Sequence, residues 1–350
     1  MFYYQDLETI VFTFHEILSE EPDELIILSG YLGPKPVEKL KELPFKVTVI
    51  GGMYSRGINA KLYDALESTE QNYKNISVIF SSEEIHSKIY IWRKSNKILS
   101  ALIGSANFSS KGLRTEMRET LAQANRGTFT MMNNYINNIY STSIKAPEII
   151  DKSKVRFNDN MSIQNRENTI NEDPTCELPL YNISKGQKLV SGKSGLNWGL
   201  SSGHTAIGDA YIRLPNKLVQ SNPLLFKAYD PQFEYTLSKK RRQSDPIELI
   251  WDDGVTMEAS FEGVQKDKEG NRYPKQLTSY SLKAPKSSDG ERISAKSILG
   301  RYLRKRLGVS LTEKIQYSDL IKYGRDTITI SRIDEGIYYC DFSKKEGKNL

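Results

Sequence analysis

The chain has 350 residues, enough for two domains, because a single hydrophobic core seldom serves so many residues. Its 26% charged and 38% hydrophobic residues are typical of a soluble protein, and no apolar run has the length of a membrane span or the layout of a signal peptide. The net charge of +6 permits a polyanionic partner. Cys176 and Cys340 are too few for a disulfide framework or a zinc site. Together with the lack of a signal peptide and of a membrane span, this predicts a cytoplasmic protein that does not bind membranes.

Helical and strand-like patterns alternate along the first 150 residues. Helices are predicted at 7–18, 36–43, 58–66 and 128–139, and strands at 25–30, 46–52, 76–80, 84–93, 98–103 and 120–124. This alternation predicts an α/β domain with a mixed sheet. Gly30 and Gly51-Gly52 end two of the strands, at the carboxyl edge where open α/β sheets bind their ligands.

The predicted strand 84–93 carries the residues with the clearest chemistry. Period-two alternation places His86 and Lys88 on one face, and the next apolar run ends in a turn with Ser105 and Asn107. An imidazole, an ammonium, a hydroxyl and a carboxamide suit a phosphate, because they can attack phosphorus, neutralise charge and donate hydrogen bonds. A single His on a strand is usually structural, but here two separate pieces occur in a fixed order.

The pattern His86-x-Lys88 followed by Gly104-Ser105-x-Asn107 resembles the half-site signature of the phospholipase D superfamily. In that superfamily a Glu just before the next strand accepts a hydrogen bond from the catalytic imidazole. Its position favours Glu119, with Glu116 as the alternative, and a solvated loop carboxylate is the structural explanation for either. The fuller superfamily pattern has an Asp where Arg93 stands, which leaves the role of that Asp vacant.

The second half of the chain changes character after a polar stretch at 158–171. We therefore predict an N-terminal domain at 1–165, a linker at 166–180 and a C-terminal domain at 181–350. Strands are predicted at 210–214, 246–251, 256–261, 327–330 and 336–341, and helices at 295–306 and 318–323. Asp252-Asp253-Gly254 predicts a hairpin turn. A mostly-β body of this kind predicts a small barrel.

Basic and aromatic residues recur in this half, at 239–242, at 272–276 and at Arg325. Each cluster alone is consistent with solvated charge, but beside a phosphate-cleaving domain they favour DNA binding. Six segments resemble the C-terminal domain of NgoFVII-type restriction endonucleases: 197–199, 209–213, 251–254, 273–277, 296–300 and 323–326. In that family this domain is a B3-like pseudobarrel, similar to those of plant B3 transcription factors and BfiI-type restriction enzymes.

The two resemblances together imply a restriction endonuclease that cleaves double-stranded DNA at a specific sequence without a metal ion or another cofactor. Superfamily members with a single motif build one active site from two half-sites. The chain has only three His, at 15, 86 and 204, so the resemblance implies a homodimer through the N-terminal domains. One His86 then forms a phosphohistidine and the other acts as acid and base. Lys88, Ser105 and Asn107 hold the non-bridging oxygens, and Glu119 fixes the imidazole tautomer.

B3-like domains grip the major groove with two arms, which by position are residues 201–213 and 271–276. Arg213, Lys275 and Gln276 suit contacts with base edges. Lys239 and Arg241 suit phosphates, which affect affinity at all sequences alike. The complete set of expected DNA-binding residues is Ser202, His204, Asp209, Tyr211, Arg213, Lys239, Arg241, Arg272, Tyr273, Lys275 and Gln276. A rigid turn is the structural explanation for Tyr273-Pro274.

The resemblance also brings further partners and leaves alternatives open. The chain has no Gly-x4-Gly-Lys-Ser/Thr loop, so any ATP dependence comes from a separate helicase-like ATPase subunit. A cognate methyltransferase belongs to such a system.

One alternative function is a DNA-binding module whose nuclease domain has degenerated, for which Arg93 is the only support. Another is a lipid phosphodiesterase, which the basic barrel disfavours.

Overall fold

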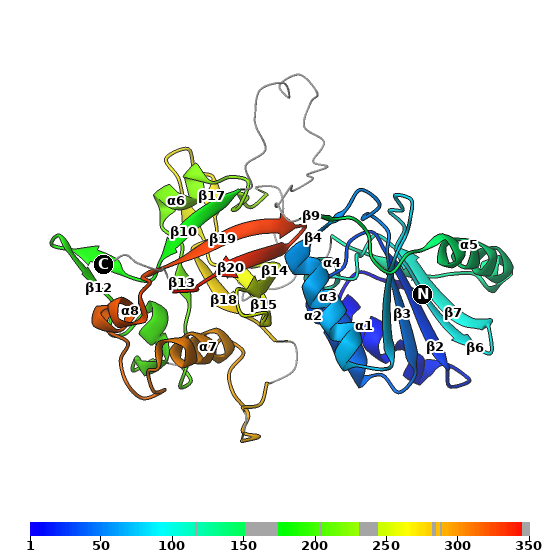
Figure 1. Cartoon of the computed structure of the whole chain (residues 1–350), viewed down its shortest axis with the longest axis horizontal. Helices are drawn as coiled ribbons and strands as arrows, with labels where there is room; N and C mark the ends of the chain where they lie inside the picture. Colours follow the sequence, from blue (N-terminus) through cyan, green and yellow to red (C-terminus); the bar gives the residue numbers. More distant parts are fainter. Residues whose placement is uncertain are drawn as a thin grey trace. The chain divides into compact units, whose positions relative to one another are not determined.

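The computed structural model describes residues 1–115, 118–150, 174–203, 205–230, 244–281, 285–287 and 289–344. Its contacts divide the chain into two compact units (Figure 1). The first comprises Met1–Glu172 with Ile333–Ile337, and the second Asp173–Arg332 with Tyr338–Leu350. Part of the predicted linker, residues 166–173, lies outside the described residues. No helix in the described ranges is long and apolar enough to cross a membrane.

The first unit contains a seven-stranded sheet in the order β1-β8-β7-β6-β2-β3-β5. Its strands are β1 Phe2–Tyr3, β2 Glu24–Ser29, β3 Lys46–Gly51, β5 Ile76–Phe80, β6 Ile89–Lys94, β7 Lys97–Gly104 and β8 Leu121–Gln123. Strands β2, β3 and β5 are parallel, and the remaining neighbours pair antiparallel. Two short strands, β4 Ile58–Asn59 and β9 Ile149–Ile150, form a separate parallel pair. The predicted mixed α/β sheet is confirmed.

Helices cover both faces of this sheet. They are α1 Leu7–Thr13, α2 Pro34–Lys39, α3 Ala60–Asn72, α4 Ser110–Arg114 and α5 Phe129–Thr142, with 3-10 turns at Phe14–Ile17, Leu40–Glu42 and Arg126–Thr128. Ile136 and Ile139 of α5 pack with Ile26, Ile91 and Ala101 of the sheet. Figure 1 shows α5 and α3 on opposite sides. Strands buried on both faces read as continuous apolar runs, which is why the central strands were readily predicted.

The second unit contains a seven-stranded sheet in the order β10-β19-β20-β14-β15-β18-β13. Its strands are β10 Thr175–Pro179, β13 Ile212–Arg213, β14 Ser244–Trp251, β15 Thr256–Glu262, β18 Gln276–Ser279, β19 Thr327–Asp334 and β20 Ile337–Asp341. The first and last strands of this order, β10 and β13, lie next to each other, so the sheet nearly closes into a barrel. Two hairpins add the pairs β11 Asn182–Ser184 with β12 Gln187–Leu189, and β16 Gln265–Lys266 with β17 Arg272–Tyr273.

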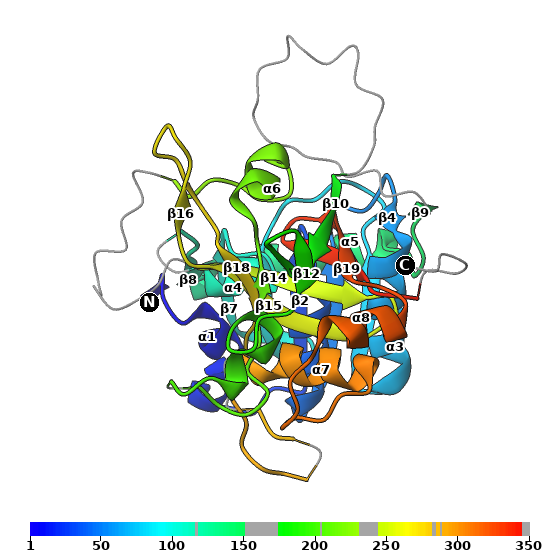
Figure 2. The same cartoon turned by 90° about the vertical axis from the view of Figure 1, so that its left-hand side faces the viewer.

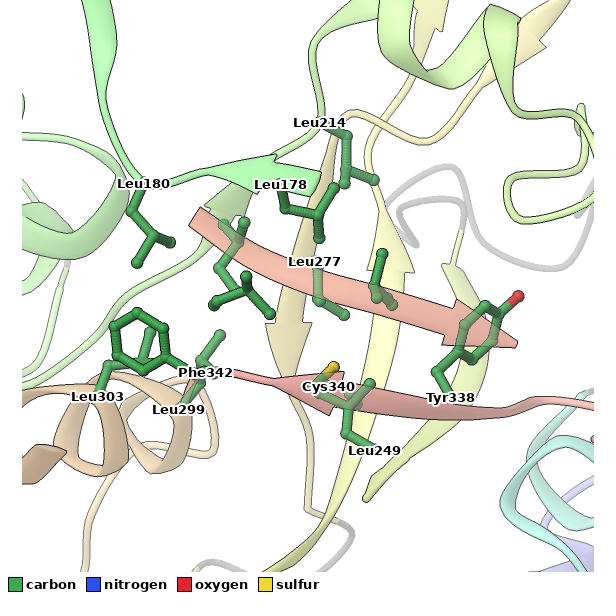
Figure 3. Close-up of a cluster of buried hydrophobic side chains, with 14 of the residues drawn as sticks. Leu178, Leu180, Leu214, Leu249, Leu277, Leu299, Leu303, Tyr338, Cys340 and Phe342 are labelled. Atoms are coloured by element: carbon green, nitrogen blue, oxygen red, sulfur yellow. The ribbon is translucent and has the colours of Figure 1, made fainter. Parts of the chain in front are cut away.

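The barrel-like sheet encloses one apolar core, and helices pack against this core at the ends of the sheet. Figure 3 shows Leu178, Leu249 and Leu277 from the strands within this core, with Leu299 and Leu303 of α7 near Phe342. Helices α7 Ser297–Leu307 and α8 Tyr317–Tyr323 lie side by side, and α6 Asn216–Ser221 lies at the opposite end (Figures 1 and 2). A 3-10 segment spans Gly195–Leu200. The predicted mostly-β barrel is confirmed.

Candidate active site and DNA-binding residues

His86 and Lys88 lie in an extended segment just before β6, which begins at Ile89. The prediction of one strand over 84–93 was therefore wrong in its start. The reason is pairing: β2 pairs with β6 only as far as Leu28 opposite Ile89, and it ends one residue later. The segment is nevertheless anchored, because Gly104 N donates to Lys88 O over 3.2 Å. This hydrogen bond joins the two pieces of the motif.

The motif side chains converge around Gly30, the residue that follows β2. A Cβ built on Gly30 lies 3.1 Å from His86 Cδ2, 3.2 Å from Asn107 Oδ1 and 3.3 Å from Lys88 Nζ. Three side chains from two separate segments thus surround one backbone position that carries no side chain. The sequence pattern placed Gly30 at a ligand-binding edge of the sheet, and the structure puts it at the centre of the candidate site.

Hydrogen bonds from neighbouring residues fix the turn that carries Asn107. Tyr90 Oη donates to Ala106 O over 2.8 Å, and Tyr31 N donates to Asn107 Oδ1 over 3.2 Å. At Gly104 any Cβ would clash with the carbonyl oxygen of Thr120 on the neighbouring segment, so glycine permits this close approach. Tyr31 also places its ring edge-on to the His86 imidazole, 6.2 Å between centroids. Sequence reasoning did not identify Tyr31.

Ser105 and Glu119 form a second group at the same edge. Ser105 Oγ accepts a hydrogen bond from Thr120 N over 3.1 Å and donates one to the Glu119 carboxylate. Burial raises the pKa of Glu119, and this hydrogen bond opposes the rise. Among the described residues the hydrogen bond of Glu119 thus goes to Ser105, and its expected role at His86 stays a prediction. Glu116 lies outside the described residues.

Burial sets the charge state of the two central groups. Lys88 is 5% exposed, and burial lowers its pKa to about 8, with the Glu335 carboxylate and then the Glu119 carboxylate opposing the shift. Its ammonium donates to His86 O over 2.6 Å. Partial burial, and then the Lys88 charge, lower the pKa of His86. The imidazole is therefore mainly neutral at pH 7 and offers a nitrogen lone pair beside a buried cation.

Arg93, at the position of the missing Asp, is buried in a hydrogen-bond network with β2 and helix α5. Its guanidinium donates to Glu24 Oε2 over 3.0 and 2.7 Å and to Asn133 Oδ1 over 3.1 Å. It thereby links β6 to β2 and to helix α5. A structural role accounts for an arginine at this position.

In the second unit, two of the expected base-contacting residues lie on adjacent strands. Arg213 of β13 is the register partner of Gln276 of β18, and Lys275 immediately precedes β18. Leu214 N donates to Lys275 O, which joins the residue after β13 to the residue before β18. Arg213 and Lys275 are exposed, and Arg213 Nη1 donates to Asn182 Oδ1 over 3.0 Å. Arg213 and Gln276 therefore lie opposite each other on paired strands, and Lys275 directly precedes Gln276 along the chain.

The other expected DNA-binding residues are less uniform. Ser202 is exposed, and Tyr211 lies edge-on to Trp198 at 5.7 Å. Asp209 is 5% exposed and accepts from Ala206 N, so its carboxylate orders its own loop. Two half-buried neighbours are Arg272 and Tyr273, the latter packed against the core. His204, Lys239 and Arg241 lie outside the described residues.

Several of the basic residues in this half are structural. Arg325, counted among the basic clusters, is 2% exposed and forms an ion pair with Asp341 at 2.8 Å. Arg304 is equally buried and donates to the backbone oxygens of Ser310 and Glu313. Arg306 donates to Asp252 Oδ2 over 2.8 Å. Counting cations along the sequence therefore overstated the charge available to DNA.

An α/β domain with a His-Lys-Asn site, followed by a β-barrel-like domain, is the organisation of a nuclease with a separate DNA-binding domain. Residues 5–150 match the family model of the NgoFVII restriction endonuclease N-terminal PLD domain, and residues 174–334 match the NgoFVII C-terminal B3-like DNA-binding domain. The chain belongs to the NgoFVII restriction endonuclease family, and the predicted resemblance is confirmed. It is a restriction endonuclease with a PLD nuclease domain and a DNA-binding domain.

Solved structures with some similarity match about two fifths of the chain. NucT from Helicobacter pylori is 16% identical, with 40% of this chain and 87% of that chain covered and a TM-score of 0.29. A phospholipase D family member, Nuc from Salmonella typhimurium, is 11% identical, with 40% and 90% covered and a TM-score of 0.29. Polyphosphate kinase from Porphyromonas gingivalis is 14% identical, with 42% and 26% covered and a TM-score of 0.29. None of the curated proteins compared with the chain matches it.

Proposed function

We propose that this endonuclease is a type II-like enzyme that hydrolyses double-stranded DNA at a specific sequence, without a metal ion, through a phosphohistidine. The observation that carries the proposal is the convergence of His86, Lys88 and Asn107 around Gly30. A neutral imidazole supplies the nucleophile, and an ammonium and a carboxamide supply donors for the phosphate oxygens.

The reaction takes two displacements at phosphorus. A ring nitrogen of His86 attacks, so a P–N bond forms and the P–O bond to the leaving oxygen breaks. The leaving oxygen takes a proton from the imidazolium form of His86 in a second copy, so the reactive dimer carries one neutral and one protonated His86. Water then attacks the phosphohistidine and gives a proton to that second imidazole, the P–N bond breaks, and both His86 side chains return to their starting states. Lys88 and Asn107 donate to the non-bridging oxygens throughout, and the burial of Lys88 strengthens its attraction for the developing charge.

A second copy is required because, within the part of the chain that the structure describes, one imidazole reaches the site. The ring of His15 packs against Phe45, with 5.2 Å between centroids, so it serves the core. Beside the motif, Tyr135 Oη lies 3.1 Å from Ser87 Oγ, and Met131, one turn earlier on α5, is 66% exposed. We propose that the second copy covers this apolar surface next to His86 and completes the site.

Sequence recognition belongs to the second unit in this proposal. Arg213 and Lys275 suit guanine and Gln276 suits adenine, and their strands lie side by side. The recognition sequence is protected by a cognate methyltransferase. A helicase-like ATPase is a further partner, whose contribution is measured by comparing cleavage with and without it.

The test is incubation of the full chain with mixed-sequence DNA in excess EDTA, followed by sequencing of the ends. We expect cuts at one sequence, and we expect His86→Ala to lose cleavage while retaining binding to that sequence. Undiminished cutting by His86→Ala, or cutting that requires a divalent ion, contradicts the proposal. A matched control is His15→Gln, whose half-buried imidazole packs against Phe45 and is not part of the motif.

The alternative of a degenerate nuclease domain rested on Arg93. Since the ion pair with Glu24 accounts for Arg93, no observation now favours that alternative. It predicts site-specific binding with no cleavage under any condition, which the same experiment detects. A lipid phosphodiesterase predicts hydrolysis of liposomes, and we expect none.

A further inference from the structure

Ser29 is the last residue of β2, lies outside the sequence signature and is 0% exposed. Its hydroxyl has a partner on each side. Ser29 Oγ donates to Tyr31 O over 2.7 Å and accepts from Phe108 N over 2.8 Å. One hydroxyl thus fastens the turn after β2 to the residue that follows Asn107.

The same turn determines the orientation of the Asn107 carboxamide. Tyr31 N donates to Asn107 Oδ1 over 3.2 Å, and a backbone N–H can only donate, so the atom that faces it must be the oxygen. The Ser29 hydroxyl also lies at hydrogen-bond distance from this oxygen, with 3.5 Å between Ser29 Oγ and Asn107 Oδ1. With its oxygen held on this side, the NH₂ group of Asn107 is directed away from Tyr31 N.

We propose that Ser29 is a positioning residue that acts through Asn107, by holding the Ser29–Tyr31 turn whose backbone fixes the carboxamide with its NH₂ group toward the scissile phosphate. This inference rests on the proposed cleavage of a phosphodiester at the His86 site. It assigns a role in transition-state stabilisation to a residue that never contacts the substrate.

The physical requirement is for a group that donates and accepts at once. Without the hydroxyl, Phe108 N and Tyr31 O each lose the hydrogen bond to Ser29, and this loss favours a shift of the two segments relative to each other. Such a shift moves Tyr31 N relative to Asn107 Oδ1. Misplacement of about 1 Å costs on the order of 100-fold in rate, so even a partial shift is measurable.

A double-mutant cycle under single-turnover conditions separates positioning from general destabilisation. Asn107→Ala removes a transition-state donor, and we expect the cleavage rate to fall about 100- to 1,000-fold. Ser29→Ala should lower the rate about 10-fold with unchanged DNA affinity. If Ser29 acts through Asn107, the double variant is no slower than Asn107→Ala alone. Ser100→Ala is the matched control, because this buried serine of β7 accepts from Gln123 Nε2 instead, and its rate should be unchanged.

Each outcome decides the inference. If the double variant is about 10-fold slower than Asn107→Ala, Ser29 acts independently of the carboxamide and the inference is wrong. A normal cleavage rate for Ser29→Ala also overturns the inference. Should Ser29→Ala not fold, Ser29→Cys takes its place in the same cycle, because a thiol keeps a weak donor and acceptor. If His86→Ala still cuts DNA, the proposed function itself has failed. If His86→Ala is inactive and the cycle is additive, only the role of Ser29 is wrong.

Discussion

Replacing Arg93 by Asp restores the residue of the fuller superfamily pattern and tests whether that position belongs to the active site. In the structure the guanidinium makes two hydrogen bonds to Glu24 Oε2 and one to Asn133 Oδ1, and Arg93 is 7% exposed. Arg93→Asp deletes these bonds and places a second carboxylate in the region of Glu24. We therefore expect a less stable first unit and no gain in cleavage.

The magnitude follows from the partial exposure of the pair. Breaking a buried ion pair by removing one partner costs about 3–5 kcal/mol. The Glu24 side chain is 24% exposed and water compensates part of this loss, so we expect about 2–3 kcal/mol. For a unit of this size, 1 kcal/mol shifts Tm by about 2–4 °C, which gives a decrease of about 4–12 °C.

The assay is thermal unfolding of the full chain together with cleavage in EDTA at a temperature where the variant is folded. Lys94→Ala is the matched control, since the neighbouring pair of Lys94 with Glu20 is exposed at 45% and 58% and contributes at most about 1 kcal/mol. An Arg93→Asp variant with unchanged Tm, or with faster cleavage than the parent, refutes the structural role of Arg93.

Three further predictions address the two units. Gly30→Ala should slow cleavage about 10-fold while the fold is kept, because its methyl presses on the convergent side chains; Gly192→Ala, which meets nothing closer than 3.8 Å, should have no effect on rate. The cleavage rate should fall as pH rises through about 8, where Lys88 loses its proton. Lys88→Arg should cleave more slowly overall but show no such fall, because arginine keeps its charge. A fall near pH 8 in that variant would show that Lys88 is not the group that titrates. Arg306→Ala should destabilise the second unit by about 2–3 kcal/mol and leave the DNA affinity of the folded protein unchanged. Lys275→Ala should leave stability unchanged, weaken binding to the recognition sequence by about 1–3 kcal/mol and relax the preference for one base; the reverse pattern in thermal unfolding and binding titrations counts against both roles.

The sequence predicted strands β2, β3, β5 and β7 because their buried residues leave apolar runs, whereas the short β1, β4 and β9 and helix α4 were not predicted. It failed at the start of β6, where alternation continues through His86 but the partner strand does not. Alternation reports which side a residue faces, whereas a strand needs a neighbour to share its hydrogen bonds. The length of β2, not any property of residues 84–88, decides where β6 begins.

The site was predictable where its residues carry distinctive chemistry and not where they support others. His86, Lys88 and Asn107 form a spaced motif, but Ser29 and Tyr31 act through a hydroxyl and a backbone N–H that no pattern distinguishes. In the second unit, the Asp252-Asp253-Gly254 signal correctly predicted a hairpin between β14 and β15. The same aspartates also bind Arg306, and that partnership is invisible without the fold.

The division into two units with separate cores has a consequence for how such enzymes diversify. Substitutions at Arg213, Lys275 and Gln276 change side chains on one barrel and leave the packing around Gly30 untouched. Target preference can therefore drift, or be exchanged by recombination of whole segments, without any need to rebuild the catalytic half. On the proposed assignment of Arg213, Lys275 and Gln276, an enzyme with this architecture changes its target through a few side chains of the second unit, and the residues of the cleavage site stay the same.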